Sequence, residues 1–284
     1  MALKIDQKIN IDSEPCVVAW KNNKLFIGTE NGSIECLNAD LSPSAKWLAH
    51  DVQLFAIAAS DKHVYSTSND GTIRVWTFNG DKVVEIATVG TDIGALYILN
   101  GKQLYAGDEG GNIFVYEDHI LIASYNVLEE VKDVIVNPPY MFTARDLYVT
   151  VTEIKPDQSK DRFVTRHVME GRAPLRIING SYLLAIARGG NSLQLHELSM
   201  DSKFKKIHEV KVSDMILTSL STSEDVAWTG GWDGIVRRWK ISGNKIEAAG
   251  DINLGACING LVAPSPESAY AIVTGGSIVK VNAA

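Results

Sequence analysis

The chain has 284 residues, of which 45% are apolar, and a formal net charge of −7 at pH 7. This length and apolar content suffice for one large all-β domain or two small domains. The sequence contains no run of 18 apolar residues, so we expect no transmembrane helix. Residues 1–10 lack the continuous apolar core of a signal peptide. The acidic balance argues against direct binding to nucleic acid or to an anionic membrane.

The cysteines and histidines indicate neither a disulfide framework nor a metal site. Cys16, Cys36 and Cys257 are an odd number, lie in apolar runs and show no paired spacing. We interpret them as small core residues of a reduced, intracellular protein, cytoplasmic with the nucleus left open. The six histidines are scattered without metal-ligand spacing, so we expect no metal and no cofactor.

The first part of the chain predicts short strands. Residues 3–11 alternate apolar and polar side chains but have no partner in the unit that follows. Three strands are predicted at 16–20, 25–29 and 33–37, and residues 47–48 are predicted to begin a fourth strand.

The second unit carries the strongest local signal. Asn69-Asp70-Gly71 lies between the alternating runs 63–68 and 72–76. Asp-Gly between two such runs indicates a β-hairpin, because glycine tolerates positive φ and aspartate can bond the backbone of its own turn. An outermost strand is predicted at 82–88.

This second unit resembles a WD40 repeat, with Trp76 at the tryptophan of the Trp-Asp signature. The resemblance implies a buried hydrogen-bond chain formed by His50, Ser66, Asp70 and Trp76. Each side chain has the donor or acceptor that this role needs. His, Ser and Asp are also the residue types of a hydrolase catalytic triad, but we interpret this set as structural.

Similar units follow along the chain. Strands are predicted at 94–99, 103–107, 112–116 and 119–125; 132–137, 140–144, 147–154 and 162–169; 175–178, 182–187 and 192–196; 215–220, 226–229 and 235–241; and 257–262, 269–273 and 277–281. Residues 155–161 are predicted to be a polar connection between two strands, on the bottom face of the molecule. If the top face does not bind a partner, this segment is the next candidate surface.

The position of Trp76 recurs throughout the chain. The column reads Leu37, Trp76, Tyr116, Thr152, His196, Trp239 and Val281, at spacings between 36 and 44 residues. These spacings are close to the ~40–45 residues of the repeat. We therefore expect an all-β, seven-bladed propeller of WD40 type, with 1–284 as a single domain. Its last blade has three strands, so residues 3–11 are predicted to supply the fourth and close the ring.

The sixth unit matches the motif nearly as well as the second. Thr229, Asp233 and Trp239 occupy the hydroxyl, aspartate and tryptophan positions. No histidine stands where the counterpart of His50 should be, so we expect this hydrogen-bond network to be incomplete.

We find no convincing catalytic constellation, and expect a protein that is not an enzyme. There is no Gly-x-Ser-x-Gly elbow and no Gly-rich phosphate loop that opens a helix. The alternative from another class is a hydrolase with carboxylates gathered at the central channel. Its candidates are the acids of the hairpin turns, namely Glu30, Asp70, Glu109, Asp146 and Asp233.

The better candidates for function precede the turn aspartates. The resemblance implies that this position lies on the top face near the channel, where partners dock. The column reads Glu30, Asn69, Glu109, Arg145, Gly189 (or Arg188), Trp232 and Thr274. Trp and Arg are the residue types that dominate interface energetics. Arg172, in the loop entering the fifth unit, is predicted to lie near Arg145 and Arg188.

From this pattern we expect a scaffold or adaptor that binds a partner peptide on the top face, through Arg145, Arg172, Arg188, Trp232, Glu109 and Asn69. The alternative within binding modules is a reader of acidic or phosphorylated peptides. Residues 145–188 carry eight Arg and Lys against five Asp and Glu, unlike the rest of the chain, and arginine forks suit carboxylates and phosphates. We expect a monomeric propeller within a larger complex.

Overall fold

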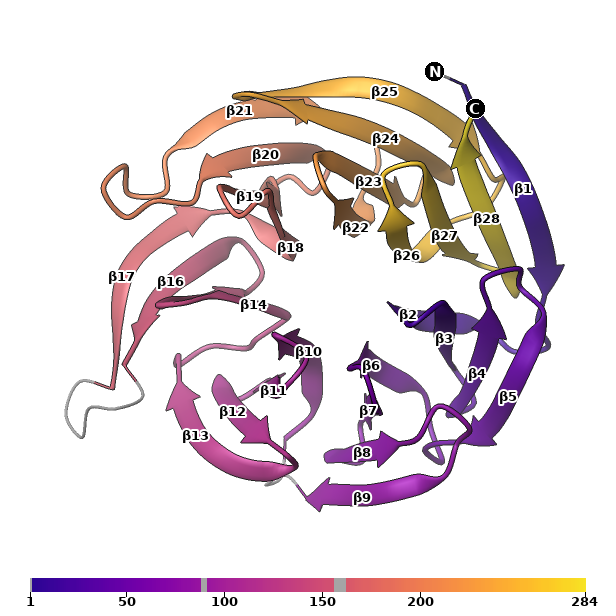
Figure 1. The fold of residues 1–284 in the computed structure, drawn as a ribbon. Coiled ribbons are helices and arrows are strands. Elements are labelled where there is room, and N and C mark those ends of the chain that lie inside the picture. The colour runs from indigo at the N-terminus through magenta and orange to yellow at the C-terminus, as the bar shows by residue number, and fades with distance from the viewer. Residues whose placement is uncertain (1, 88–90, 156–161) are drawn as a thin grey trace.

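The structure is a computed structural model that describes residues 2–87, 91–155 and 162–284. The regular elements of these residues are β-strands, which form seven antiparallel sheets of four strands. The sheets are the blades of a closed ring, as Figure 1 shows. The prediction of an all-β, seven-bladed propeller is confirmed. None of the described segments forms a helix with the length and apolar character needed to cross a membrane.

Blades one to four follow the chain, each from its innermost to its outermost strand. They are β2 (Pro15–Lys21), β3 (Lys24–Thr29), β4 (Ser33–Asn38) and β5 (Pro43–Leu48); β6 (Leu54–Ala59), β7 (Val64–Ser68), β8 (Thr72–Trp76) and β9 (Lys82–Ala87); β10 (Ile93–Leu99), β11 (Gln103–Asp108), β12 (Asn112–Glu117) and β13 (Ile120–Asn126); and β14 (Asp133–Asn137), β15 (Tyr140–Ala144), β16 (Tyr148–Ile154) and β17 (Phe163–Glu170).

Blades five and six repeat this order, and blade seven combines both ends of the chain. They are β18 (Arg172–Ile178), β19 (Tyr182–Ile186), β20 (Ser192–Glu197) and β21 (Lys206–Lys211); β22 (Leu217–Ser223), β23 (Val226–Gly231), β24 (Ile235–Ser242) and β25 (Lys245–Asn253); and β26 (Ile258–Ser265), β27 (Ser268–Val273), β28 (Ser277–Ala283) and β1 (Leu3–Asn10).

One predicted strand in blade one is wrong. Trp47 and Leu48 end the outermost strand β5 and do not begin it. The chain turns directly after them, because the N–H groups of Ala49 and His50 both donate to the carbonyl of Gly32. The excursion predicted at 155–161 lies, apart from Lys155, outside the described residues.

The N-terminal strand closes the ring as the sequence predicts. β1 pairs antiparallel with β28, with Leu3 opposite Ala283 and Ile9 opposite Ile278. Ala284 N–H also donates to the carbonyl of Ala2 at 2.9 Å. The two ends of the chain therefore share one sheet, which joins the first and last blades.

A repeated register shift fixes the tryptophan column. In six blades the pairing of the third strand with the outermost strand slips by a bulge directly before the column residue. The shifts fall at Cys36/Leu37, Val75/Trp76, Val115/Tyr116, Val151/Thr152, Leu195/His196 and Arg238/Trp239. In blade seven the shift lies at Ile5/Gln7, with Ile5 opposite Val281. The residues of the tryptophan column therefore occupy equivalent positions in their blades, although their side chains differ in chemistry.

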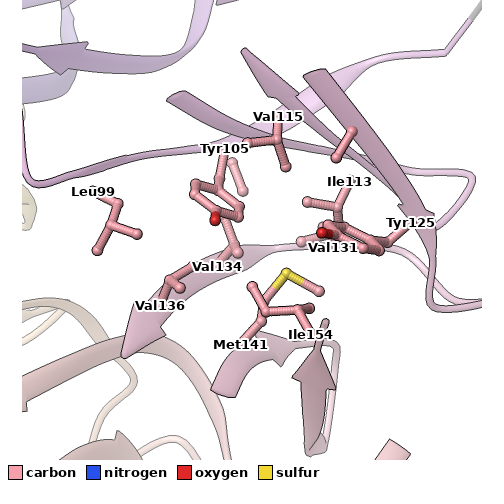
Figure 2. Packing of buried hydrophobic residues seen from close by; sticks show 12 residues of the cluster. Leu99, Tyr105, Ile113, Val115, Tyr125, Val131, Val134, Val136, Met141 and Ile154 are labelled. Atoms are coloured by element: carbon pink, nitrogen blue, oxygen red, sulfur yellow. The ribbon is translucent and has the colours of Figure 1, made fainter. Parts of the chain in front are cut away.

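The hydrophobic core is divided among the blades. Each cluster of buried apolar side chains in the described residues lies between two neighbouring blades. Figure 2 shows the one between blades three and four, where Tyr105 of β11 faces Met141 of β15. A single blade therefore cannot bury its faces without both neighbours.

The innermost strands of all seven blades surround a central channel. A cavity of about 190 Å³ there is lined by residues of β2, β6, β10, β14, β18, β22 and β26. Cys16 lines this channel and, like Cys257, is only partly buried, whereas Cys36 is fully buried. The prediction that all three cysteines are core residues is therefore wrong for two of them.

Deleting residues 1–11 should destabilise the whole ring and cause aggregation. The deletion exposes the edge of β28 and removes Leu3 from the cluster between blades six and seven. Thermal unfolding and light scattering measure both effects, with deletion of residues 1–2 as the control. A soluble monomer with the melting temperature of the parent would contradict the structural role of β1.

Candidate functional site

The loops that enter the blades and the turns between second and third strands share one face, which we call the top face. Hydrogen bonds connect the two kinds of segment. Ala49 and His50 N–H donate to Gly32 O at 2.9 and 3.0 Å, and Val212 and Ser213 N–H to Asn191 O at 3.0 and 3.2 Å. The candidate residues of the turns are therefore held on a rigid frame.

In blade two the structure brings the four residues of the proposed network together. Trp76 Nε1 donates to Ser66 Oγ at 3.0 Å, and that oxygen lies 2.9 Å from His50 Nε2. His50 Nδ1 lies 2.8 Å from Asp70 Oδ2. Because a carboxylate only accepts, Nδ1 carries the imidazole proton and Nε2 accepts from Ser66.

The electrostatics of this network keep the imidazole neutral and the carboxylate charged. Burial lowers the pKa of His50, although Asp70 opposes this effect. Burial alone would raise the pKa of Asp70, but hydrogen bonds from His50 and Thr72 outweigh it and lower that pKa to about 2. His50 and Ser66 have no exposed surface, so neither can meet a substrate.

Blade six contains two separate pairs where blade two contains a chain. Trp239 Nε1 donates to Thr229 Oγ1 at 2.9 Å. Ser213 Oγ donates to Asp233 Oδ2 at 2.7 Å. The same carboxylate oxygen also lies 2.7 Å from Arg237 Nη1. No imidazole bridges the two pairs.

Sequence reasoning missed the role of Ser213, although a signal was present. Ser213 precedes Asp233 by the 20 residues that separate His50 from Asp70. Serine is too short to reach both Asp233 and the hydroxyl of Thr229. The absence of the histidine therefore interrupts the network.

An open groove of about 590 Å³ lies at this place on the top face. It is lined by Lys211, Val212, Ser213, Asp214, Met215, Asp233, Ile235 and Arg237. In blade two, Arg74 NH1 spans the equivalent region and donates to Ala49 O at 2.6 Å. Arg237 pairs with Asp233 as Arg74 pairs with Asp70, and beside it Met215 is 51% exposed.

Trp232 directly precedes Asp233, which lines this groove. Trp232 is 60% exposed, and its backbone N–H donates to Ile216 O at 3.0 Å. The backbone is fixed while the indole remains available to a partner. Asn69 and Glu109 are also exposed, but they lie in the turns of blades two and three.

Arg145 and Arg188 come together on one aromatic ring, which sequence reasoning did not identify. Their guanidinium carbons lie 5.1 and 5.5 Å from the ring centroid of Tyr148. Both positions fall within the distance of a cation–π contact. Tyr148 begins β16 directly after the turn of blade four, so the short turn brings the ring under Arg145.

Arg172 is not in a loop, contrary to the sequence-based expectation. It is the first residue of β18 and pairs with Ile186, because only Gly171 separates β17 from β18. A β-carbon added at Gly190 would lie 3.1 Å from Arg172 NH1 and 2.6 Å from Ile216 Cδ1. Gly190 thus lies between Arg172 and Ile216, whose carbonyl accepts the hydrogen bond from the backbone N–H of Trp232.

The arginines do not form a free cationic patch. Arg145 forms an ion pair with Glu129, and Arg188 lies 3.4 Å from Glu170. Glu129 belongs to the loop before blade four, outside the basic segment 145–188. Glu129 therefore compensates one positive charge of that segment from outside, whereas Glu170 belongs to the segment itself.

The channel offers little support for hydrolytic chemistry. Its lining contains one carboxylate, Asp133, which accepts from Leu175 N–H at 2.8 Å and lies 3.3 Å from Arg176 NH1. Burial raises the pKa of the Cys16 thiol to about 11, which disfavours the nucleophilic thiolate. Across the described ranges, no three His, Cys, Asp or Glu side chains gather to hold a metal.

Replacing His50 by Ser, the residue of blade six, should lower the free energy of unfolding by about 1–3 kcal/mol, because it leaves buried partners unsatisfied. The reverse change, Ser213→His, should add the missing link in blade six and raise the denaturation midpoint. Equilibrium unfolding in urea measures both. A His50→Ser variant with the midpoint of the parent would show that the network contributes nothing to stability.

Comparisons with known proteins agree with this geometry at the level of the fold. No protein-family model and no curated protein matches the sequence. Solved structures do match: that of U3-55K has a TM-score of 0.84 at 15% identity, covering 99% of this chain and 98% of that chain. The crystal structure of the RRP9 WD40 repeats has a TM-score of 0.83 at 15% identity, covering 99% and 97%. The chain therefore has the fold of the WD40-repeat propellers.

Proposed function

We propose that this chain is a non-catalytic scaffold or adaptor that binds a peptide segment of a partner protein on its top face, across blades four to six. The observation that carries the proposal is the exposure of Trp232. The residue is 60% exposed, at a turn position that holds the polar Asn69 and Glu109 in blades two and three. Exposed aromatic anchors of this kind dominate the energetics of protein interfaces.

The surroundings of Trp232 support an extended ligand. Met215 adds a second exposed apolar side chain, and the groove beside it has a volume of about 590 Å³. Gly190 lies between Ile216, which follows Met215 of this groove, and Arg172, the first residue of blade five. A peptide on this path would place an apolar residue at Trp232 and polar residues toward Tyr148.

Replacing Trp232 by Ala should weaken partner binding by at least about tenfold, since interface hot spots cost about 2 kcal/mol or more on truncation. Affinity capture from cell extract, followed by titration of the recovered partner, measures the effect. Val83→Ala is the matched control, because Val83 is an exposed apolar residue of the outermost strand β9. Equal binding by parent and Trp232→Ala protein would overturn the proposed site.

A second candidate is a reader of acidic or phosphorylated motifs. It is favoured by the convergence of Arg145 and Arg188 on Tyr148, which presents two guanidinium groups to one ligand. A carboxylate or phosphate would have to replace Glu129 and Glu170 as the partners of these arginines. Doubly charged phosphate competes for a guanidinium better than a single carboxylate does.

Reversing Arg145 and Arg188 to Glu should abolish binding of an acidic or phosphorylated partner while the melting temperature falls only slightly, because the pair of Arg188 is exposed and that of Arg145 is partly exposed, and such ion pairs contribute little to stability. Binding by the parent should also weaken as salt rises. The control reverses Lys46 and Arg166, two exposed cations of β5 and β17, and produces the same change in net charge. Normal binding by the Arg145/Arg188 variant would exclude this candidate without affecting the proposal for Trp232.

A further inference from the structure

The outermost strand of blade three differs from the other outermost strands in its charge. β13 has the sequence Ile-Leu-Ile-Ala-Ser-Tyr-Asn and contains no charged residue. The other six outermost strands, β1, β5, β9, β17, β21 and β25, each contain at least one Lys, Arg, Asp or Glu. Each outermost strand has a strand partner on one side only, so all of them are sheet edges.

Charge on an edge strand prevents unwanted pairing. An edge presents unpaired backbone N–H and C=O groups, and proteins protect it with charged side chains, especially lysine. The bulge in the β12–β13 ladder does not compensate, because the same bulge occurs in the other blades. Among the outermost strands, β13 alone has no charge to protect it.

The apolar side chains of β13 are also exposed. Ile120, Leu121 and Ile122 are consecutive and are 68%, 51% and 47% exposed. In Figure 1 the strand lies on the outer rim of the ring, away from the channel. Three adjacent exposed aliphatic residues on an open edge are a predicted site of strand addition.

The other end of β13 holds the strand in place. Ala123 and Tyr125 are buried in the cluster between blades three and four, where Figure 2 shows Tyr125 near Val131. The ring of Tyr125 also packs against Phe163 of β17, with centroids 5.6 Å apart. The edge is therefore fixed in an extended conformation before anything binds to it, which lowers the entropic cost of pairing.

We propose that the edge of β13 is an interface for a second copy of this chain, in which the two β13 strands pair antiparallel about a two-fold axis. The charged residues of the outermost strands indicate which strand can pair with β13. Pairing β13 with any other outermost strand of the chain would bring a charged side chain against Ile120, Leu121 and Ile122, at a desolvation cost. A second β13 is the one outermost edge of the chain without such a charge.

Pairing of this kind stops at two copies. An isologous contact uses the same strand from both partners, so neither edge remains open. The acids before blade four do not oppose it strongly, because Glu129 pairs with Arg145 and Glu130 lies 3.5 Å from Lys132. A homodimer would replace the monomer expected from the sequence, and would leave the top face of both rings available.

Sedimentation velocity of the purified full chain over a wide range of concentration tests this interface. The parent should show a concentration-dependent equilibrium of monomer and dimer. Leu121→Lys places on β13 the kind of charge that the other edges carry, and should raise the dissociation constant at least tenfold, or about 1.4 kcal/mol. Val83→Lys is the matched control, since Val83 is 43% exposed on β9, which already contains Lys82 and Glu85.

Hydrogen exchange gives an independent measurement. Backbone amides of β13 should become protected as the concentration of the parent rises, while those of β9 should not change. If Leu121→Lys protein fails to fold, Ile120→Lys replaces it, because Ile120 is still more exposed. A parent that stays monomeric, an unaltered dimer in the lysine variant, or open-ended polymers would each overturn the proposal. Trp232→Ala protein should dimerise normally, which separates this interface from the proposed partner site.

Discussion

The pairing of β1 with β28 is the constraint on which the rest of the structure depends. The buried side chains lie between neighbouring blades, so each blade needs a partner on both sides. Blade seven gains its fourth strand from the beginning of the chain, which places Leu3 in one cluster and Ile9 in the next. Closing the ring therefore completes two cores at once and leaves neither blade one nor blade seven with an open face.

Within this ring, blades two and six show how one register supports two uses. Both place a hydroxyl, an aspartate and a tryptophan at equivalent positions. Histidine at position 50 connects them into a buried chain, whereas serine at position 213 leaves two separate pairs and lines a surface groove. The serine thus interrupts the internal hydrogen-bond chain, and it lines the groove next to which we propose that the partner binds.

The proposed surfaces are physically different from each other. The top face combines an exposed indole with arginines already paired to glutamates, which suits a peptide of mixed character. The rim at β13 combines an uncharged edge with exposed aliphatic side chains, which suits another strand. Because they lie on different faces of the ring, one copy could engage both kinds of partner.

The sequence by itself determined the fold, the order of the blades and the closure by residues 3–11. Its information was local: the turn at Asn69-Asp70-Gly71, alternating strands and a regular repeat spacing all depend on neighbours along the chain. Only the tertiary structure decided the surroundings of each side chain. The convergence of Arg145 and Arg188 on Tyr148, the compensation by Glu129 and the strand position of Arg172 depend on contacts between different blades. A one-dimensional pattern fixes which residues repeat, but charge and exposure arise from segments that meet in space.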